Sequence, residues 1–487
     1  MPMEINILKP KCWAILFALF LPTPILLAKE LFPEKVIEQA KKSVVTIDVS
    51  ASFAAYEKGN KWSGTGCVVD KGHGYLLTNQ HVIGAAVVGN YKVTFFNGIQ
   101  QEAHLVYYDP WLDYGFLQVA PTAIPQEVTE ATFSRRNPVM DQPIFIVGNN
   151  AGYSFSLHTG VVADLYEVEG NMPQHSVKLS LNTKGGSSGS PVFNKHGQAI
   201  ALNYAGNNTF ALAIHPEYIR YALSAIRQGK CPIRKQIGII TQSTPIKDLV
   251  QYDGLPTSCQ QQYIKTFPNG ATSVIGVDYV LTGSPADGLL FPGDVIWAIN
   301  GQQIGPNLVA FDMAMNLATT DHVVLTIFRM GQWHNIKIGL YDLERHKIKK
   351  MVHFGGAIFF EMDDYSAKIN GIAAKNLTFV KADANHIFNH VAPNRIKNDF
   401  RVKVLSFNEK PLASLEALGA VIPSLIAKKY FTIAYTDLSP FYSFGALHLG
   451  TRPSRDYVEY RAHIPQPRWF TWDETHHQWI SSPISVE

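Results

Sequence analysis

The chain has 487 residues, which is too long for one hydrophobic core and long enough for about three domains. Hydrophobic residues make up 46% and charged residues 17% of the sequence, as is typical of a globular protein. A net charge of +3 without a long basic run gives no reason to expect a nucleic-acid partner.

We predict that residues 1–28 are a cleaved signal peptide. Two lysines precede an apolar run that extends from Cys12 to Ala28, which is the pattern of a secretory signal. The alternative is an uncleaved membrane anchor, but the run is short for a span of about 20 residues and contains the helix breakers Pro22 and Pro24. We therefore expect export to the periplasm of a Gram-negative cell, with secretion or membrane association as the alternatives.

The first predicted domain covers residues 29–228. A helix over 34–42 and a strand over 43–50 are followed, up to about residue 208, by short apolar runs that Gly, Asn, Asp and Pro separate. This spacing is typical of an all-β double barrel. A helix over 216–227, with apolar residues at helical spacing, would close the domain.

Three segments of this domain supply, in chain order, a histidine, an aspartate and a serine, each beside the end of a predicted strand. They are His81, Asp113 and Ser188, and Ser188 lies in a Gly-Gly-Ser-Ser-Gly-Ser-Pro turn. The order is that of a chymotrypsin-like triad and differs from the order in subtilisins and α/β-hydrolases. Ser187 and Ser190 compete with Ser188 as the nucleophile.

Each residue type has a chemical role. A serine hydroxyl is a poor nucleophile without a base, which His81 would supply, and Asp113 would orient and stabilise the imidazolium. Gly186 and Gly189 allow backbone angles that other residues rarely adopt. The backbone amides of Gly186 and Ser188 would then form an oxyanion hole.

These segments resemble the HtrA/Deg-family serine proteases, in which PDZ domains follow a chymotrypsin-like domain. The matching segments are 64–69, 77–83, 109–110 with Asp113, Gly148 and 186–191. The serine segment is most similar to the eukaryotic-type multi-PDZ Deg proteins. The resemblance implies an ATP-independent serine endopeptidase of protein quality control that acts on unfolded or damaged proteins, has no cofactor or metal, and assembles into trimers or multiples of trimers.

The S1 pocket should be lined by the segments before Ser188 and after Asn203. Tyr204, Ala205 and Phe210 favour an apolar pocket, with no acidic residue placed to receive Lys or Arg. The resemblance implies small or medium aliphatic P1 residues.

Residues 235–342 resemble a PDZ domain. Gly293 and Asp294 make a tight turn into a strand, and Asn300-Gly301 is a hairpin signal. A PDZ groove binds a C-terminal peptide by adding it to a sheet edge, with the carboxylate in a nest of amides. The alternative is a PDZ-shaped spacer with a closed groove. The predicted carboxylate loop consists of Gln236, Ile237, Gly238 and Ile239.

Residues 351–440 are predicted to be a second, degenerate PDZ-like domain. Candidate strands cover 355–360, 401–408 and 430–435, and a helix is expected over 412–425, but the Gly-Asp turn is missing. Residues 441–487 are predicted to be a tail rich in Trp, Tyr, Pro and His. The fold class is therefore mainly β: a double β-barrel, one PDZ domain and one degenerate PDZ-like domain.

The cysteines leave one question open. Cys67, beside two valines, is expected to be a buried small hydrophobic residue. Cys231 and Cys259 could pair in an oxidising compartment, which sequence alone does not settle.

Two other functions remain open at this point. One is a peptide-binding chaperone or scaffold with weak or no proteolysis, and the other is a secreted protease with one specific partner substrate. Replacing Ser188 with alanine separates the first from a protease, because client holding would survive the replacement.

Overall fold

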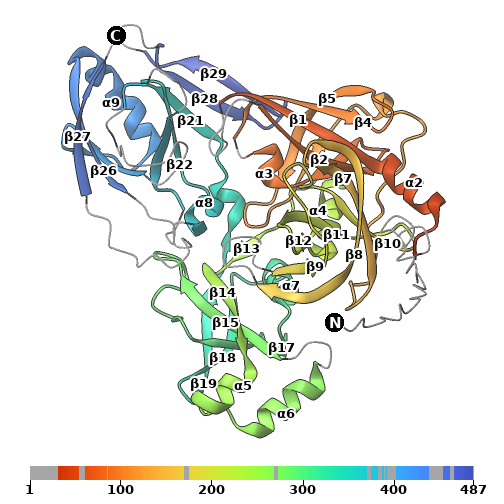
Figure 1. Cartoon of the computed structure of the whole chain (residues 1–487). Coiled ribbons are helices and arrows are strands. Elements are labelled where there is room, and N and C mark those ends of the chain that lie inside the picture. The colour runs from red at the N-terminus through yellow and green to blue at the C-terminus, as the bar shows by residue number, and fades with distance from the viewer. Residues whose placement is uncertain are drawn as a thin grey trace, which may run out of the picture.

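A computed structural model of the whole chain (Figure 1) describes residues 31–53, 61–84, 86–168, 175–267, 272–369, 374–381, 386–388, 391, 402–437, 453–460 and 465–485. The predicted signal peptide, residues 1–28, lies outside the described residues. In the described ranges, no helix has the length and apolar character that a membrane crossing requires.

The first part of the chain forms two closed antiparallel barrels, which we call the barrel domain (Figure 1). The strands of the first barrel are β1 (Val44–Phe53), β2 (Lys61–Asp70), β3 (Tyr75–Thr78), β4 (Val88–Phe95), β5 (Gln100–Tyr108) and β6 (Gly115–Gln118). Their order in space is β1-β2-β3-β6-β5-β4.

The strands of the second barrel are β7 (Pro143–Asn150), β8 (Tyr153–Val168), β9 (His175–Leu179), β10 (Pro191–Asn194), β11 (Ala199–Gly206) and β12 (Ala211–Ile214). Four short helices accompany the two barrels: α2 (Glu34–Ser43), α3 (Gln80–Ile83), η1 (Pro121–Ala123) and α4 (Pro216–Ile226). The predicted mainly β architecture with a double barrel is confirmed.

The middle domain contains a six-stranded sheet of β14 (Ile239–Pro245), β15 (Ser273–Val280), β16 (Val295–Ile299), β17 (Gln302–Gln303), β18 (His322–Arg329) and β19 (Gln332–Gly339). Its helices are α5 (Ile246–Tyr252), α6 (Thr257–Thr266) and α7 (Leu308–Asn316), and a short ladder joins β13 (Lys235–Gln236) to β20 (Tyr341–Asp342). Asn300 and Gly301 both have positive φ and connect the paired strands β16 and β17, as the hairpin signal predicted.

After η2 (Leu343–His346), the C-terminal domain forms a nine-stranded sheet. Its strands are β21 (Lys350–Phe354), β22 (Ala357–Glu361), β23 (Leu377–Lys381), β24 (Val402–Phe407), β25 (Lys410–Pro411), β26 (Tyr430–Asp437), β27 (Pro453–Glu459), β28 (Arg468–Asp473) and β29 (Gln478–Pro483). The helices of this domain are α8 (Asp364–Ile369) and α9 (Leu415–Ala427).

The segment that we expected to be a tail supplies three strands of this sheet. β27 pairs with β26, and β28 pairs with β21 at Trp469 opposite Val352. Its aromatic residues are suited to a half-buried pleated surface, which explains why the segment forms strands. The sheet therefore continues past the boundary that we predicted at residue 440.

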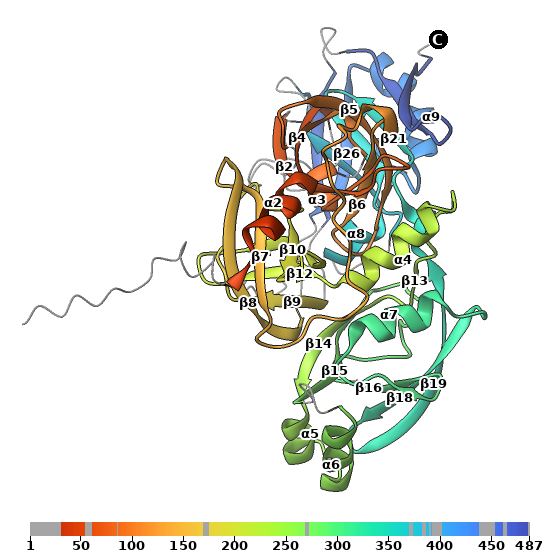
Figure 2. The ribbon, with the colours of Figure 1, turned by 90° about the vertical axis from the view of Figure 1, so that its right-hand side faces the viewer.

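The barrel domain and the middle domain share one hydrophobic core. Tyr218 and Leu223 of α4 belong to the same buried cluster as Ile240 of β14 and Val309 and Met313 of α7. In Figure 1 and Figure 2, α8 leaves the C-terminal sheet and lies near the centre of the molecule, close to the barrels and the middle domain.

A glycine in α9 tests whether the C-terminal strands are part of this domain. A Cβ atom at Gly419 would lie 2.2 Å from the indole of Trp469 on β28. We expect Gly419→Ala to lower the free energy of unfolding by about 2 kcal/mol, because this overpacking exceeds the gain in helix propensity of about 1 kcal/mol. Urea denaturation would measure the change, with Ala420→Ser on the exposed side of α9 as the control. An unchanged Gly419→Ala variant would mean that β28 does not pack on α9.

Candidate active site

The histidine and the aspartate of the predicted triad are in contact. His81 Nδ1 lies 2.6 Å from Asp113 Oδ2, and the backbone amide of His81 donates to Asp113 Oδ1 at 2.8 Å. Asn79 Nδ2 donates to the carbonyl oxygen of Asp113 at 2.7 Å. Because a carboxylate only accepts, Nδ1 carries the proton, and Nε2 of the neutral ring is the atom that can accept one.

Burial of this pair is asymmetric. The Asp113 side chain is 6% exposed, whereas the His81 side chain is 40% exposed. The structure thus shields the carboxylate from water while one edge of the imidazole remains accessible.

The serine turn separates the three candidate nucleophiles. Ser187 is buried and donates its hydroxyl to the carbonyl of Lys184 at 2.6 Å, and Ser190 is fully buried. Ser188 is half-buried and donates to the carbonyl of Tyr204 at 3.3 Å. Of the three, Ser188 is the one that a substrate could reach.

The two glycines of the turn are required by its geometry. Gly186 has a φ of +96° and Gly189 a φ of +86°, a region that other residues rarely adopt. A Cβ at Gly189 would lie 2.0 Å from the carbonyl oxygen of Thr65, so the turn and β2 approach too closely for any side chain there. Among the described residues, the amides of Gly186 and Ser188 donate no hydrogen bond.

Thr65, to which the sequence assigned no role, holds the turn in place from the first barrel. Its hydroxyl donates to the carbonyl of Gly186 at 2.8 Å and accepts from the amide of Asn149 at 2.9 Å. Its own amide donates to the carbonyl of Ser188 at 2.9 Å. No sequence signal distinguishes Thr65 from other strand residues, because its partners come from β7 and from the serine turn, which are both distant in sequence.

Of the residues predicted for the S1 pocket, Tyr204 accepts from Ser188 through its carbonyl oxygen, and the surroundings of the three are more polar than expected. Tyr204 is buried and its hydroxyl lies 2.7 Å from Ser176 Oγ, while Ala205 and Phe210 are half-buried. Lys178 Nζ lies 4.7 Å from the centre of the Phe210 ring. Glu167 Oε1 pairs with that ammonium at 3.0 Å. The sequence indicated the aromatic residue but not this ion pair.

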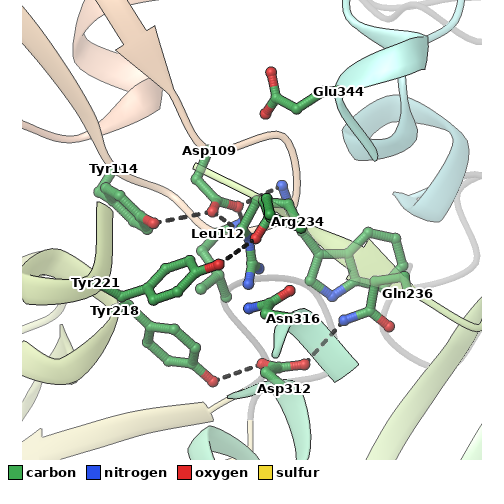
Figure 3. A network of polar contacts seen from close by, with 12 residues as sticks. Asp109, Leu112, Tyr114, Tyr218, Tyr221, Arg234, Gln236, Asp312, Asn316 and Glu344 are labelled. Atoms are coloured by element: carbon green, nitrogen blue, oxygen red, sulfur yellow. Dashed lines mark hydrogen bonds and ion pairs between the residues drawn. The ribbon is translucent and has the colours of Figure 1, made fainter. Parts of the chain in front are cut away.

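The predicted carboxylate loop is covered. Ile237 and Ile239 are buried, and Gln236 Nε2 donates to Asp312 Oδ1 of α7 at 2.9 Å. From the barrel domain, the hydroxyl of Tyr218 donates to Asp312 Oδ2 at 2.6 Å (Figure 3). Since the facing sides of β14 and α7 share their core with α4, the expected peptide groove between them is packed against the barrel domain.

The described residues contain neither a disulfide nor a candidate metal site. Cys231 and Cys259 are both free thiols, so the disulfide that the sequence left open is not formed, and Cys67 is fully buried. Burial raises the pKa of the Cys67 thiol well above its ordinary value. The part of the chain that the structure describes contains no group of three or more His, Cys, Asp or Glu that could hold a metal ion.

Known proteins resemble this chain over much of its length. Residues 64–202 match the family model "Trypsin-like peptidase domain". The pro-apoptotic serine protease NMA111 of Meyerozyma guilliermondii is 29% identical over 425 residues, which is 84% of this chain and 42% of that protein. The Aspergillus fumigatus protein of the same name is 27% identical over 428 residues, 84% of this chain and 40% of its own length.

The chain thus contains a region, residues 64–202, that matches trypsin-like peptidase domains, and most of its length is similar to fungal serine proteases. Among solved structures, the HtrA-type protease AlgW with tripeptide is 20% identical, covers 63% of this chain and 96% of its own, and has a TM-score of 0.47. The chain spans about two fifths of the length of the curated relatives.

The predicted periplasmic location is wrong. The relatives that match over 84% of the chain are fungal proteases rather than exported bacterial ones. The prediction rested on the apolar N-terminal run, and the composition of so short a segment does not by itself identify a cellular compartment.

Thr65 provides the first test of the active site. We expect Thr65→Val to lower kcat by about tenfold or more with a smaller change in KM, because the carbonyl of Gly186 loses its donor and the turn shifts. Hydrolysis of a fluorogenic peptide would measure this, with Thr94→Val on β4 as the matched control. Equal activity of the two variants would show that the Thr65 hydroxyl does not hold the turn.

Proposed function

We propose that this protein is an ATP-independent serine endopeptidase in which Ser188 is the nucleophile, His81 the general base and Asp113 the orienting carboxylate. The observation that carries the proposal is the buried Asp113 paired with an accessible His81, beside a turn where Ser188 is the one accessible serine. The matched trypsin-like peptidase model, residues 64–202, includes all three residues.

The reaction follows from these groups. His81 Nε2 takes the proton of the Ser188 hydroxyl as its oxygen attacks the scissile carbonyl carbon. The amides of Gly186 and Ser188, which have no other acceptor among the described residues, stabilise the negative oxygen of the tetrahedral intermediate. His81 then returns the proton to the leaving amine, and water hydrolyses the acyl-enzyme by the same route in reverse. No cofactor or metal takes part.

Tyr204, Ala205 and Phe210 would form an S1 pocket for small or medium aliphatic side chains. The pair of Lys178 and Glu167 beside Phe210 is internally neutral, so it adds no net attraction for a charged P1 residue. Unfolded or damaged proteins expose such aliphatic residues, which supports a role in protein quality control.

The domain organisation is part of the proposal. Residues 29–228 would be the protease domain, 235–342 a PDZ domain, and 351–440 a degenerate PDZ-like domain that strands of 441–487 extend. A homo-oligomer built from trimers is proposed from the family resemblance alone.

The first measurement is casein degradation by the wild-type protein beside Ser188→Ala. We expect cleavage by the wild type and a loss of at least about 10⁴-fold in the variant, because the nucleophile is removed. Ser224→Ala, on the exposed side of α4, is the control and should match the wild type. If Ser188→Ala still cleaves casein, the assignment of Ser188 as the nucleophile is wrong. If neither the wild type nor Ser188→Ala cleaves casein and both prevent aggregation of an unfolded client, the protein is a chaperone.

Peptide binding by the middle domain should depend on the contact with α4. Truncating Tyr218 to alanine removes the ring that packs on α7 and its hydrogen bond to Asp312. We expect Tyr218→Ala to bind an apolar C-terminal peptide about tenfold or more tightly than the wild type, because less energy is needed to uncover the groove. Fluorescence anisotropy would measure this, with Tyr252→Ala on exposed α5 as the control. Equal binding by wild type and Tyr218→Ala would mean that α4 does not cover the groove.

A further inference from the structure

The loop that carries Asp113 is held together by one carboxylate. This loop, residues 109–113, joins β5 to β6, and both Trp111 and Leu112 are 2% exposed. Asp109 Oδ1 accepts the amides of Trp111 and Leu112 at 2.8 and 2.7 Å, and Asp109 Oδ2 accepts the hydroxyl of Tyr114 at 3.0 Å. The position of Asp113 therefore depends on what surrounds Asp109 and Trp111.

The first cation at this loop comes from the linker that leads into the middle domain. Arg234 Nε lies 2.6 Å from Asp109 Oδ2, and the two side chains are 1% and 0% exposed. Figure 3 shows Arg234 between Asp109 on one side and the group of Tyr218, Gln236 and Asp312 on the other.

The second cation comes from the C-terminal domain. Lys368 of α8 is 0% exposed, and its ammonium donates to the carbonyl oxygen of Trp111 at 3.2 Å. The same ammonium lies 4.6 Å from the centre of the Trp111 ring, within the range of a cation–π interaction. A helix 257 residues further along the chain thus contacts the loop two residues before Asp113.

We propose that Lys368 is a positioning residue for Asp113, through which the C-terminal domain supports the catalytic site. This inference rests on the proposed function, because it takes Asp113 as the triad aspartate. Lys368 acts through two effects: its hydrogen bond fixes the Trp111 carbonyl, and its positive charge stabilises the Asp113 carboxylate. It does not contact the substrate.

The charges around Lys368 support such a role. Burial lowers the pKa of its ammonium from 10.5 to about 7, while Asp312, Asp109 and Asp113 favour the charged form and Arg234 opposes it. These groups face Lys368 from α7, from the loop and from the linker. As the pH rises through about 7, Lys368 loses its proton and its attraction to Asp113 weakens.

Lys368→Met is the first test, since methionine keeps an unbranched side chain of nearly the same length without the charge or the donor. We expect kcat to fall about tenfold with KM within about twofold of the wild type, because a mobile Asp113 orients His81 less well. Lys410→Met, on an exposed hairpin of the same domain, should leave both constants unchanged. Near-ultraviolet circular dichroism would establish that each variant is folded.

Lys368→Arg tests the role of the charge. Arginine stays protonated at all relevant pH values, so the ratio of its kcat to that of the wild type should rise as the pH increases above about 7. A structural role without charge would give a constant ratio. If arginine does not fit the buried site and lowers the Tm, Lys368→Met and the wild type are compared across the same pH range. The ratio of wild-type kcat to variant kcat should fall as the pH rises through about 7, because the neutral lysine keeps its hydrogen bond to the Trp111 carbonyl but loses its charge. A ratio that does not change with pH would overturn the role of the charge.

The failure of this inference can be told from the failure of the proposed function. If Ser188→Ala abolishes cleavage but Lys368→Met matches the wild type in kcat, KM and pH profile, the enzyme stands and the positioning role is overturned. If the wild type itself is inactive, the His81 ring resonances in NMR decide. Loss of the cation near Asp113 favours protonated imidazole, so their titration midpoint should be higher in Lys368→Met than in the wild type, and an unchanged midpoint overturns the inference.

Discussion

The buried ion pair between Arg234 and Asp109 is the contact on which the arrangement of the domains depends. Burial alone would lower the pKa of Arg234, but Asp109, Tyr114 and Asp312 raise it above its ordinary value. A fully buried guanidinium without a partner costs several kcal/mol, so the linker and the loop must come together when the protein folds. Asp109 also organises the loop before Asp113. The same carboxylate therefore affects both the packing of the domains and the position of Asp113.

The middle domain enters the same network from the other side. Burial raises the pKa of Asp312, although Arg234, Tyr218 and Gln236 lower it in part. Its two oxygens accept from the barrel domain and from the predicted carboxylate loop. Because Gln236 and α7 are both engaged in this way, the region where we expected a peptide groove is packed against the barrel domain in this conformation.

The sequence was sufficient to predict features that depend on a few adjacent residues. His81, Asp113 and Ser188 could be proposed as a triad because each lies beside a strand end and the glycines of the serine turn have a stereochemical reason to be there. Cys67 was correctly placed in the core from its valine neighbours. These features need only a few adjacent residues to be recognised.

Contacts between distant segments could not be predicted in that way. The role of Thr65 becomes visible only in the folded structure, where β7 and the serine turn lie beside it. Lys368 looks like a solvated lysine at the end of a short helix, and the partner that explains it is 257 residues away. The strands β27 to β29 were read as a tail because their pairing partners lie across a nine-stranded sheet rather than next to them in sequence.

The shared network has a thermodynamic consequence for regulation. A peptide that entered the groove between β14 and α7 would have to separate α7 from α4, which would remove the partner of Tyr218 and disturb the surroundings of Arg234. Its observed affinity would therefore be reduced by the cost of that separation, and the geometry of the loop 109–113 would change in the same step. Linkage requires the converse as well: any substrate that binds better when Asp113 is well ordered must change the affinity for such a peptide by the same factor. Asp109 connects the two events, because it accepts the amides of Trp111 and Leu112 and pairs with Arg234 at the same time.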